Sequence, residues 1–326
     1  MKLTAVIPVY NAERYLPRLF KSLENQTSKD FELSIVNDGS IDHSEELILE
    51  FIKKNPDIKV IYHKIPNSGQ GAARELGINS GSGDYICFID ADDDIEPIYF
   101  EMFINAINTH HPDMVCSNYF VNDKEIKDPN YNDSLLSKEK IKKTIYPYLI
   151  QNKRYQYFLP TVWAKAFKKD IYMRNICKTN IRVGEDIAVF VPTFLQCQNV
   201  YLSSKCLYHY RVVKDSVMKS KKARSYSDVT NLYEHLKEKI EPSLFEEFSL
   251  QIDRLIAHVA FNCSVTQFYL DKSKKEIKQI IEDNLNNQII SSAIKNADAE
   301  GLKAKLMVNA LKKRKYGLMK LYGKLL

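Results

Sequence analysis

The chain has 326 residues, of which 44% are hydrophobic and 27% are charged, and its formal net charge is +6 at pH 7. This composition is ordinary for a soluble globular protein, and the length predicts one large domain or two modest ones. The mild net charge gives no reason to expect a nucleic-acid partner, so we exclude that class.

The cysteines and the N-terminal segment indicate in which cellular compartment the protein is expected. The six cysteines include no Cys-x-x-Cys pair and no His/Cys cluster, which favours reduced cytosolic thiols. The chain enters a strand at once and has no basic-then-apolar signal peptide. No apolar run reaches the roughly 18 residues that span a bilayer. We therefore expect a cytoplasmic protein, peripheral at most to the inner face of the cell membrane.

Strands alternate with helices at the start of the chain. Apolar runs predict strands at residues 3–7, 31–36, 58–62, 85–89 and 114–119. Helical spacing of apolar residues predicts helices at 12–25, 43–54, 69–79 and from about 97 to 108, the first with Asn11 as its cap. This alternation predicts an α/β fold with a mostly parallel, doubly wound sheet flanked by helices.

The middle of the chain is less regular. Residues 121–152 are polar and lysine-rich, which predicts a loop followed by a surface helix. Residues 155–163 are dense in aromatic side chains and include the only tryptophan, Trp163. Such rings can be platforms for sugars, but the composition favours ordinary core. A glycine and two acids, Gly184, Glu185 and Asp186, then open a helix at 187–195, and a strand is expected at 199–207.

The C-terminal part is predicted to be helical, without a cofactor motif. Residues 307–326 have apolar side chains at helical spacing, and lysines and an arginine line the remaining faces. This predicts a single basic amphipathic helix suited to an anionic membrane surface. A solvated helix packed on the domain is the alternative. The helical region is also a candidate for contacts within an oligomer.

Four carboxylates follow the predicted strand at 85–89, at positions 90, 92, 93 and 94. Anions this close raise one another's pKa unless a cation shares them. A divalent metal with oxygen ligands is the obvious cation. Asp93 or Asp94 could instead cap the helix that starts near Pro97. That interpretation leaves Asp90 and Asp92, which are spaced so that both could reach one ion.

Polar residues follow three of the predicted strands: Tyr10 and Asn11, then Asp38 to Ser40, then Asp90 to Asp92. Ligands of such sheets bind beyond the carboxyl ends of the strands. These three groups on one edge therefore suit a nucleotide.

Glycines point to the same edge, because five of the ten lie between residues 69 and 83. Residues 68–74 bring small residues and Arg74 to a helix start, which favours an anion. Arg74 replaces the third glycine of the dinucleotide fingerprint, and no P-loop motif is present. Both of those nucleotide-binding classes are thereby excluded.

Together these stretches resemble family 2 of the glycosyltransferases, which have the GT-A nucleotide-sugar-binding fold, and in particular the type that builds bacterial cell-surface polysaccharide. The resemblance rests on residues 6–11, 36–40, 67–74, 90–93, 163–165 and 184–186. It is close over residues 3–94 and looser to about 216. It implies a catalytic domain at 1–216, with a nucleotide-sugar half (1–120) and an acceptor half (121–216), followed by a helical region at 217–326.

The resemblance also implies a role for each matching residue. Asp38 would bind the base, usually uracil, and Asp92 would bind Mn²⁺ or Mg²⁺ at the diphosphate. Asp186 would be the catalytic base, with Glu185 beside it and with Trp163 on the acceptor side. His209 and Arg211 would approach the metal and the diphosphate, respectively. The other residues expected to contact the nucleotide sugar are Pro8, Tyr10, Asn11, Asn67, Gly69, Arg74, Asp90 and Ala91.

The function implied is metal-dependent transfer of a sugar from a UDP-sugar, with inversion, to a hydroxyl of a saccharide, lipid-linked saccharide or polymer. Two other classes stay open. A sugar-1-phosphate nucleotidyltransferase also uses a parallel sheet and metal-binding acids, but it would want a glycine-rich first turn. A non-catalytic scaffold that binds nucleotide sugar would not need the pair Glu185 and Asp186.

Overall fold

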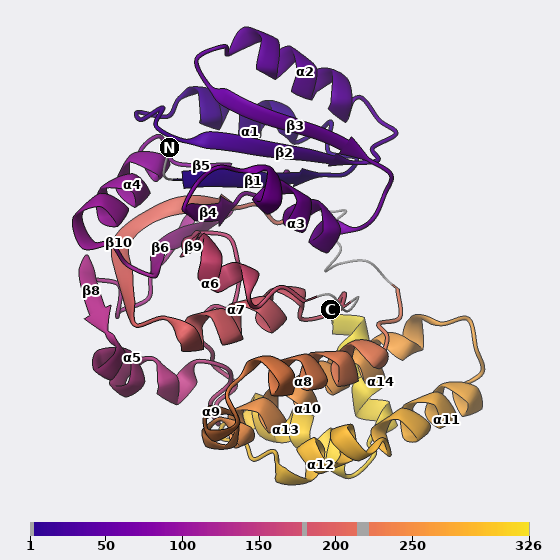
Figure 1. Cartoon of the computed structure of the whole chain (residues 1–326). Coiled ribbons are helices and arrows are strands. Elements are labelled where there is room, and N and C mark those ends of the chain that lie inside the picture. The colour runs from indigo at the N-terminus through magenta and orange to yellow at the C-terminus, as the bar shows by residue number, and fades with distance from the viewer. Residues whose placement is uncertain (1–2, 178–180, 214–221, 326) are drawn as a thin grey trace. The chain divides into compact units, whose positions relative to one another are not determined.

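The computed structural model describes residues 3–177, 181–213 and 222–325 (Figure 1). The chain forms two compact units, each built from separate segments. The sheet unit contains Met1–Thr144, Thr161–Ile176 and Gln196–Val213. The helical unit contains Ile145–Pro160, Cys177–Leu195 and Lys214–Leu326. The predicted boundary at residue 216 lies outside the described residues.

The sheet unit is built on a ten-stranded sheet with the order β3-β2-β1-β4-β9-β6-β10-β5, in which β7 pairs with β6 and β8 pairs with β10. The first four strands along the chain are parallel: β1 (Leu3–Val9), β2 (Glu32–Asp38), β3 (Lys59–Ile65) and β4 (Tyr85–Phe88). β6 (Met114–Val121) and β10 (Asn199–Tyr210) are parallel to each other, and β9 (Lys165–Lys168) runs antiparallel between β4 and β6. The predicted α/β fold is confirmed.

The helices α1 (Leu16–Glu24), α2 (Ser44–Lys54), α3 (Gln70–Ser80) and α4 (Tyr99–His110) connect these strands (Figure 1). The expected start of the first helix at residue 12, with an Asn11 cap, is wrong. The helix α1 begins at Leu16, and Asn11 has a left-handed φ of 48°. The side-chain oxygen of Asn11 accepts from the amide of Ile41 and not from a helix amide. Pro17 lies in the first turn of α1, where its missing N–H costs nothing.

Two sequence-based interpretations, one for residues 121–152 and one for Asp93 and Asp94, are corrected by the structure. The segment expected to be a loop contains β7 (Lys124–Ile126) and β8 (Ser134–Ser137) before α5 (Lys138–Thr144). Asn122 and Asp123 both have positive φ, 46° and 68°, which is the geometry of a tight hairpin turn. Asp94 belongs to β5 (Asp94–Ile95), and the N-cap of α4 is Ile98 with no side-chain bond. The capping role considered for Asp93 and Asp94 is therefore wrong.

A buried carboxylate joins the N-terminal ends of the central strands. Glu32 on β2 accepts hydrogen bonds from Thr4 Oγ1 (2.6 Å), Ser82 Oγ (2.8 Å), the amide of Gly83 (3.2 Å) and Lys59 Nζ (2.5 Å). Its side chain has no exposed surface. Burial alone would raise its pKa, but the bonds from Lys59, Thr4 and Ser82 lower the pKa to about 2.

The helical unit contains α7 (Glu185–Gln196), α8 (Ser227–Lys239), α9 (Pro242–Glu247), α10 (Ser249–Thr266), α11 (Lys274–Leu285), α12 (Gln288–Asn296), α13 (Leu302–Lys312) and α14 (Tyr316–Leu325). The helix α10 is its centre and contacts α8, α12, α13 and α14. Residues Ile145–Pro160 also belong to the helical unit, because side chains of α10 bind this segment. Arg254 donates to the carbonyl of Gln151 (3.2 Å), and the Gln151 side chain contacts His258 (2.9 Å).

The single C-terminal helix expected over residues 307–326 is two helices. Arg314 has a left-handed φ of 48°, and its guanidinium binds the carbonyl of Leu285 (3.4 Å) and Asn286 Oδ1 (3.0 Å) next to α11. The hydroxyl of Tyr316 binds Glu282 on α11. These contacts turn the chain between α13 and α14. Among the described helices, none has the length and apolar character to cross a bilayer.

Candidate active site

The chain segments that follow β1 and β2 bind each other directly. The amide of Asn11 donates to Ser40 Oγ (3.0 Å), and Asn11 Oδ1 accepts from the amide of Ile41 (2.9 Å). Pro8 lies buried within β1, whereas 51% of Tyr10 is exposed. The result is a fixed edge on which the Tyr10 ring is open to a ligand.

Asp38 shapes the loop that leads into α3. Its two carboxylate oxygens accept from the amides of Ser68 (2.6 Å) and Gly69 (2.9 Å). The backbone of Asn67 approaches Gly39 so closely that a Cβ there would lie 2.6 Å from the Asn67 nitrogen, and Gly39 has a φ of +72°. Only glycine fits these two conditions without strain. Because a carboxylate offers about four acceptor positions, Asp38 still has capacity for a base.

Arg74 and Asp90 form the junction between α3 and the end of β4. The guanidinium of Arg74 is buried and lies 3.1 Å from Asp90 Oδ1, with Phe88 beneath it at 5.6 Å. Gln70 Nε2 also donates to Asp90 Oδ1 (3.3 Å). The start of α3 is thus held at the first aspartate of the acidic stretch. An anion at this junction would meet the positive end of a helix and a guanidinium.

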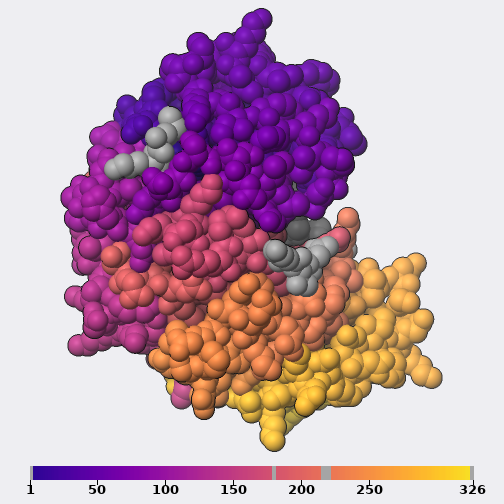
Figure 2. All heavy atoms as spheres, viewed as in Figure 1, coloured from indigo at the N-terminus to yellow at the C-terminus, as the bar shows by residue number. Residues whose placement is uncertain are grey.

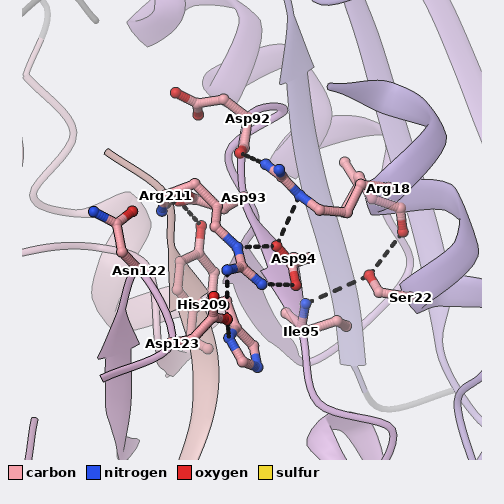
Figure 3. Close-up of polar contacts among 12 residues, drawn as sticks. Arg18, Ser22, Asp92, Asp93, Asp94, Ile95, Asn122, Asp123, His209 and Arg211 are labelled. Atoms are coloured by element: carbon pink, nitrogen blue, oxygen red, sulfur yellow. Dashed lines mark hydrogen bonds and ion pairs between the residues drawn. The ribbon is translucent and has the colours of Figure 1, made fainter. Parts of the chain in front are cut away.

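Asp93 is the most deeply buried acid of the stretch, at 1% exposed against 9% for Asp94, and Figure 3 shows it beside Arg211. It accepts from the Tyr208 hydroxyl (2.6 Å) and from the amide of Arg211 (2.8 Å). The same hydroxyl accepts from the amide of Asp90 (3.1 Å). Burial, followed by the charges of Asp90 and Asp92, raises the pKa of Asp93 to about 8. Burial and then Asp90 raise the pKa of Asp92 to about 6. The corner therefore holds more negative charge than the chain compensates.

Asp94 is paired twice. Arg211 donates to both of its oxygens (2.5 and 2.7 Å), and Arg18 Nε lies 2.9 Å from Oδ1. Arg18 also donates to the backbone carbonyl of Asp92, as Figure 3 shows. Arg211 reaches a second carboxylate, Asp123, at 2.5 Å. These bonds raise the pKa of Arg211 above its ordinary value, with the bond to Asp94 as the largest cause.

His209 and Trp163 are held by neighbours within the sheet unit. His209 Nε2 lies 2.6 Å from Glu96 Oε1, and the ring stacks on Phe120. Trp163 is 7% exposed and stacks on the rings of Tyr208 (5.0 Å) and Tyr210 (5.4 Å). The tryptophan is therefore a core residue, as the aromatic composition of residues 155–163 indicated. It packs against the ring of Tyr208, whose hydroxyl binds Asp93.

The donor set for a metal is small. Within the described residues, no three His, Cys, Asp or Glu side chains are grouped to hold an ion. The Asp92 carboxylate accepts no hydrogen bond from any other described residue, and its pKa is raised. Mg²⁺ commonly uses one or two carboxylates and takes its remaining ligands from water and substrate phosphates. Asp92, with Asp90 near it, fits such an ion when a diphosphate is present.

Glu185 and Asp186 begin α7 in the helical unit. Gly184 has a φ of +91°, and a Cβ on it would lie 2.9 Å from Leu232 Cδ2 on α8. This explains the glycine before the two acids: the chain must turn close to α8 as the helix starts. Both carboxylates lie in the first turn, where the helix dipole favours negative charge.

Sequence reasoning missed Arg18, Tyr208 and the pairing of Asp94. Arg18 follows Pro17 in a surface helix and reads as a solvated cation. Tyr208 directly follows the strand predicted at 199–207, and no local pattern marks its hydroxyl. The usable signal was charge balance, because four adjacent carboxylates require nearby cations.

The model of the family described as glycosyl transferase family 2 matches residues 4–175. The glycosyltransferase GlyA of Streptococcus pneumoniae is 33% identical over 223 residues, which are 66% of this chain and 31% of that protein. The cholesterol galactosyltransferase of Borreliella burgdorferi is 28% identical over 215 residues, which are 64% of this chain and 59% of that protein. The chain thus matches less than two thirds of the length of either relative.

Two solved structures share the fold. TarS of S. aureus (residues 1–349, with UDP) has a TM-score of 0.65 at 17% identity, over 98% of this chain and 89% of that one. The mannosyltransferase PcManGT of Pyrobaculum calidifontis, solved with GDP-Man and Mn²⁺, has a TM-score of 0.54 at 14% identity, over 99% and 84%. The family model covers more than half of the chain and the sheet has the GT-A arrangement. The chain therefore belongs to glycosyl transferase family 2.

Proposed function

We propose that the chain transfers a sugar from a UDP-sugar to a hydroxyl group of a saccharide, a lipid-linked saccharide or a polymer, with inversion at the anomeric carbon. The observation that carries the proposal is the junction of Arg74, Asp90 and Asp92 at the start of α3. It combines a buried guanidinium, a helix N-terminus and a carboxylate with a raised pKa. A guanidinium and a helix N-terminus both bind phosphate groups, and a cation shared with the phosphates would neutralise the carboxylate.

The relatives support this choice of substrate class. One TarS structure contains UDP and another contains UDP-GlcNAc, which supports a UDP-sugar as the donor. In this chain Tyr10 offers an exposed ring for the base, and Asp38 offers its remaining acceptor positions. The loop at Asn67 and Gly69 would border the diphosphate, and Ala91 would lie beside the sugar.

Each of these side chains has one role in the proposed reaction. The acceptor oxygen forms a bond to the anomeric carbon while the bond from that carbon to the phosphate oxygen breaks and UDP leaves. Asp186 takes the proton of the acceptor hydroxyl as general base, and Glu185 helps to hold that acceptor. A divalent cation, when bound at Asp92, supplies positive charge that offsets the leaving diphosphate. Arg74 adds a fixed charge on the same side.

The test is UDP release from a panel of UDP-sugars with a saccharide acceptor, with Mn²⁺ and then with a chelator. We expect release only with metal and acceptor. Asp186→Asn should lower the rate by roughly 10²–10⁴-fold and leave the affinity for UDP unchanged. The matched control is Asp170→Asn, an exposed acid paired with Arg174, which should behave as the parent.

Three results would contradict the proposal. Parent-like transfer by Asp186→Asn would remove the assigned base. Release of pyrophosphate from UTP and a sugar phosphate would indicate the nucleotidyltransferase class. Tight UDP binding without turnover on any sugar would indicate the non-catalytic scaffold.

A further inference from the structure

The positive charge of the chain is concentrated in its last segment. The chain has 47 basic and 41 acidic residues, and residues 301–326 hold eight of the basic ones and none of the acidic ones. Residues 1–300 therefore have a formal charge of −2, and residues 301–326 have +8. A segment with this charge is attracted to anionic surfaces. Figure 2 shows residues of the C-terminal part, in yellow, at the surface.

Some of these cations are used within the helical unit. Lys312 Nζ donates to the carbonyl of Ala297 (2.8 Å), and Arg314 is bound beside α11. The others that are described are exposed and have no hydrogen-bond or ion-pair partner in the described part of the chain: Lys303, Lys305, Lys313, Lys315 and Lys320. Their charge is available to an external partner.

The helix α13 combines these lysines with exposed leucines. Leu302 is 76% exposed and Leu306 is 39% exposed, whereas Val308 and Leu311 on the opposite side are buried. At 100° per residue, Leu302 and Leu306 lie on one side of the helix, and Lys313, the residue that caps its C-terminal end, follows on the same side. Lys305 borders these residues on one side and Lys303 borders them on the other. We call these five residues the lysine–leucine face.

We propose that the lysine–leucine face docks on the surface of an anionic lipid bilayer. A purely electrostatic partner, such as a soluble polyanion, would use the lysines but gain nothing from the leucines. A bilayer surface uses both, since the leucines enter the acyl boundary and the lysines meet the headgroups. Binding of this kind is reversible, and each lysine near an anionic membrane contributes about fivefold to the partition coefficient.

The residues proposed here for membrane contact differ from those that the sequence pattern predicts. The sequence pattern assigned the contact to one helix over 307–326, whose apolar line included Met307 and Leu311. Those two side chains are core. The exposed leucines lie one turn earlier, at the start of α13, where residues 302 and 306 were not part of the expected pattern. The inference does not depend on sugar transfer, because it concerns a binding step without chemistry and residues that have no assigned role in the reaction.

The test is co-sedimentation of the full chain with vesicles of phosphatidylcholine, alone or with about a third phosphatidylglycerol. One variant removes three charges of the face (Lys303→Gln, Lys305→Gln, Lys313→Gln). A matched control removes three exposed charges elsewhere in the same unit (Lys272→Gln, Lys274→Gln, Lys275→Gln). A third variant, Leu302→Ser with Leu306→Ser, keeps the net charge. Thermal unfolding and UDP affinity of each variant show that folding and the donor site are intact.

We expect binding to the anionic vesicles only, and loss of binding at high salt. The face variant should lower the partition coefficient by roughly a hundredfold, the control by far less, and the leucine variant by several-fold. Failure to sediment with anionic vesicles overturns the proposal. An equal loss of vesicle binding in the face variant and in the lysine control would overturn the proposed face, because net charge alone would then explain the binding. If the leucine variant binds vesicles as the parent does and inorganic polyphosphate competes for binding, the partner is a soluble polyanion and the bilayer proposal is overturned.

Discussion

The buried carboxylate at the N-terminal ends of the strands gives a quantitative prediction for Glu32→Gln. The native pKa of about 2 lies below the ordinary value of 4.5, so folding favours the ionised form. A shift of this size corresponds to about 3 kcal/mol of stability. The amide in the variant cannot carry the charge, and its NH₂ group faces Lys59 and Ser82, which are themselves donors. We expect the sheet unit to lose about 3 kcal/mol at pH 7, or roughly 6–12 °C in Tm.

The pH dependence has a definite sign. Because the folded pKa is lowered, the stabilisation is fully present above pH 4.5 and is lost as the pH falls towards 2. Parent and variant should therefore differ at pH 7 and converge at acid pH. Urea unfolding followed by fluorescence measures this in the correct unit, since the only tryptophan, Trp163, lies in the sheet unit.

The control is Glu50→Gln, which removes an equal charge from an exposed pair with Lys54. It should leave the Tm unchanged, because exposed ion pairs contribute little. The reasoning is refuted if Glu32→Gln differs from the parent by the same amount at pH 3 and pH 7, or if the control has a comparable effect.

Three further variants address the site. Tyr208→Phe keeps the stacking on Trp163 but removes the hydroxyl between Asp90 and Asp93; leaving a buried acceptor short of a donor should cost about 1–3 kcal/mol in urea unfolding and raise the Mn²⁺ concentration for half-maximal transfer. An unchanged metal requirement would argue against a positioning role for this hydroxyl. Arg74→Lys should weaken UDP binding measured by calorimetry, because lysine cannot repeat the planar contact with Asp90 and Phe88; equal affinity would remove Arg74 from the donor site. Gly39→Ala should destabilise the sheet unit by about 1 kcal/mol or more and weaken UDP binding, as it forces Asn67 away; Gly301→Ala, with nothing near its Cβ, is the control for the positive φ alone.

Much of the sheet was predictable because its signals are local. Each parallel strand is an apolar run closed by polar residues, and each connecting helix has its own apolar spacing. The start of α1 was not predictable in this way. The segment before it is bound to the loop and helix that follow β2, through Asn11 to Ile41 and Ala12 to Ser44, and these partners are about 30 residues away in the chain.

The acidic stretch shows the same limit at longer range. The partners of Asp93 and Asp94 are Tyr208 and Arg211, which lie 115 and 117 residues further along the chain. A local pattern offered only a helix cap as their structural role. Likewise, no local feature separates α13 from α14. The turn there is made by Arg314 and Tyr316 contacting α11, so it depends on tertiary packing.

The helical unit is interleaved in sequence with the sheet unit, and this affects how deletion experiments should be interpreted. Glu185 and Asp186 belong to the same unit as the C-terminal helices, and Gly184 is fitted against Leu232 of α8. Truncating the chain after β10 would remove α8, against which Gly184 is fitted, together with the rest of the tail. Loss of activity in such a truncated protein would therefore not by itself show that the tail recognises an acceptor, because the start of α7 would have lost a neighbour as well.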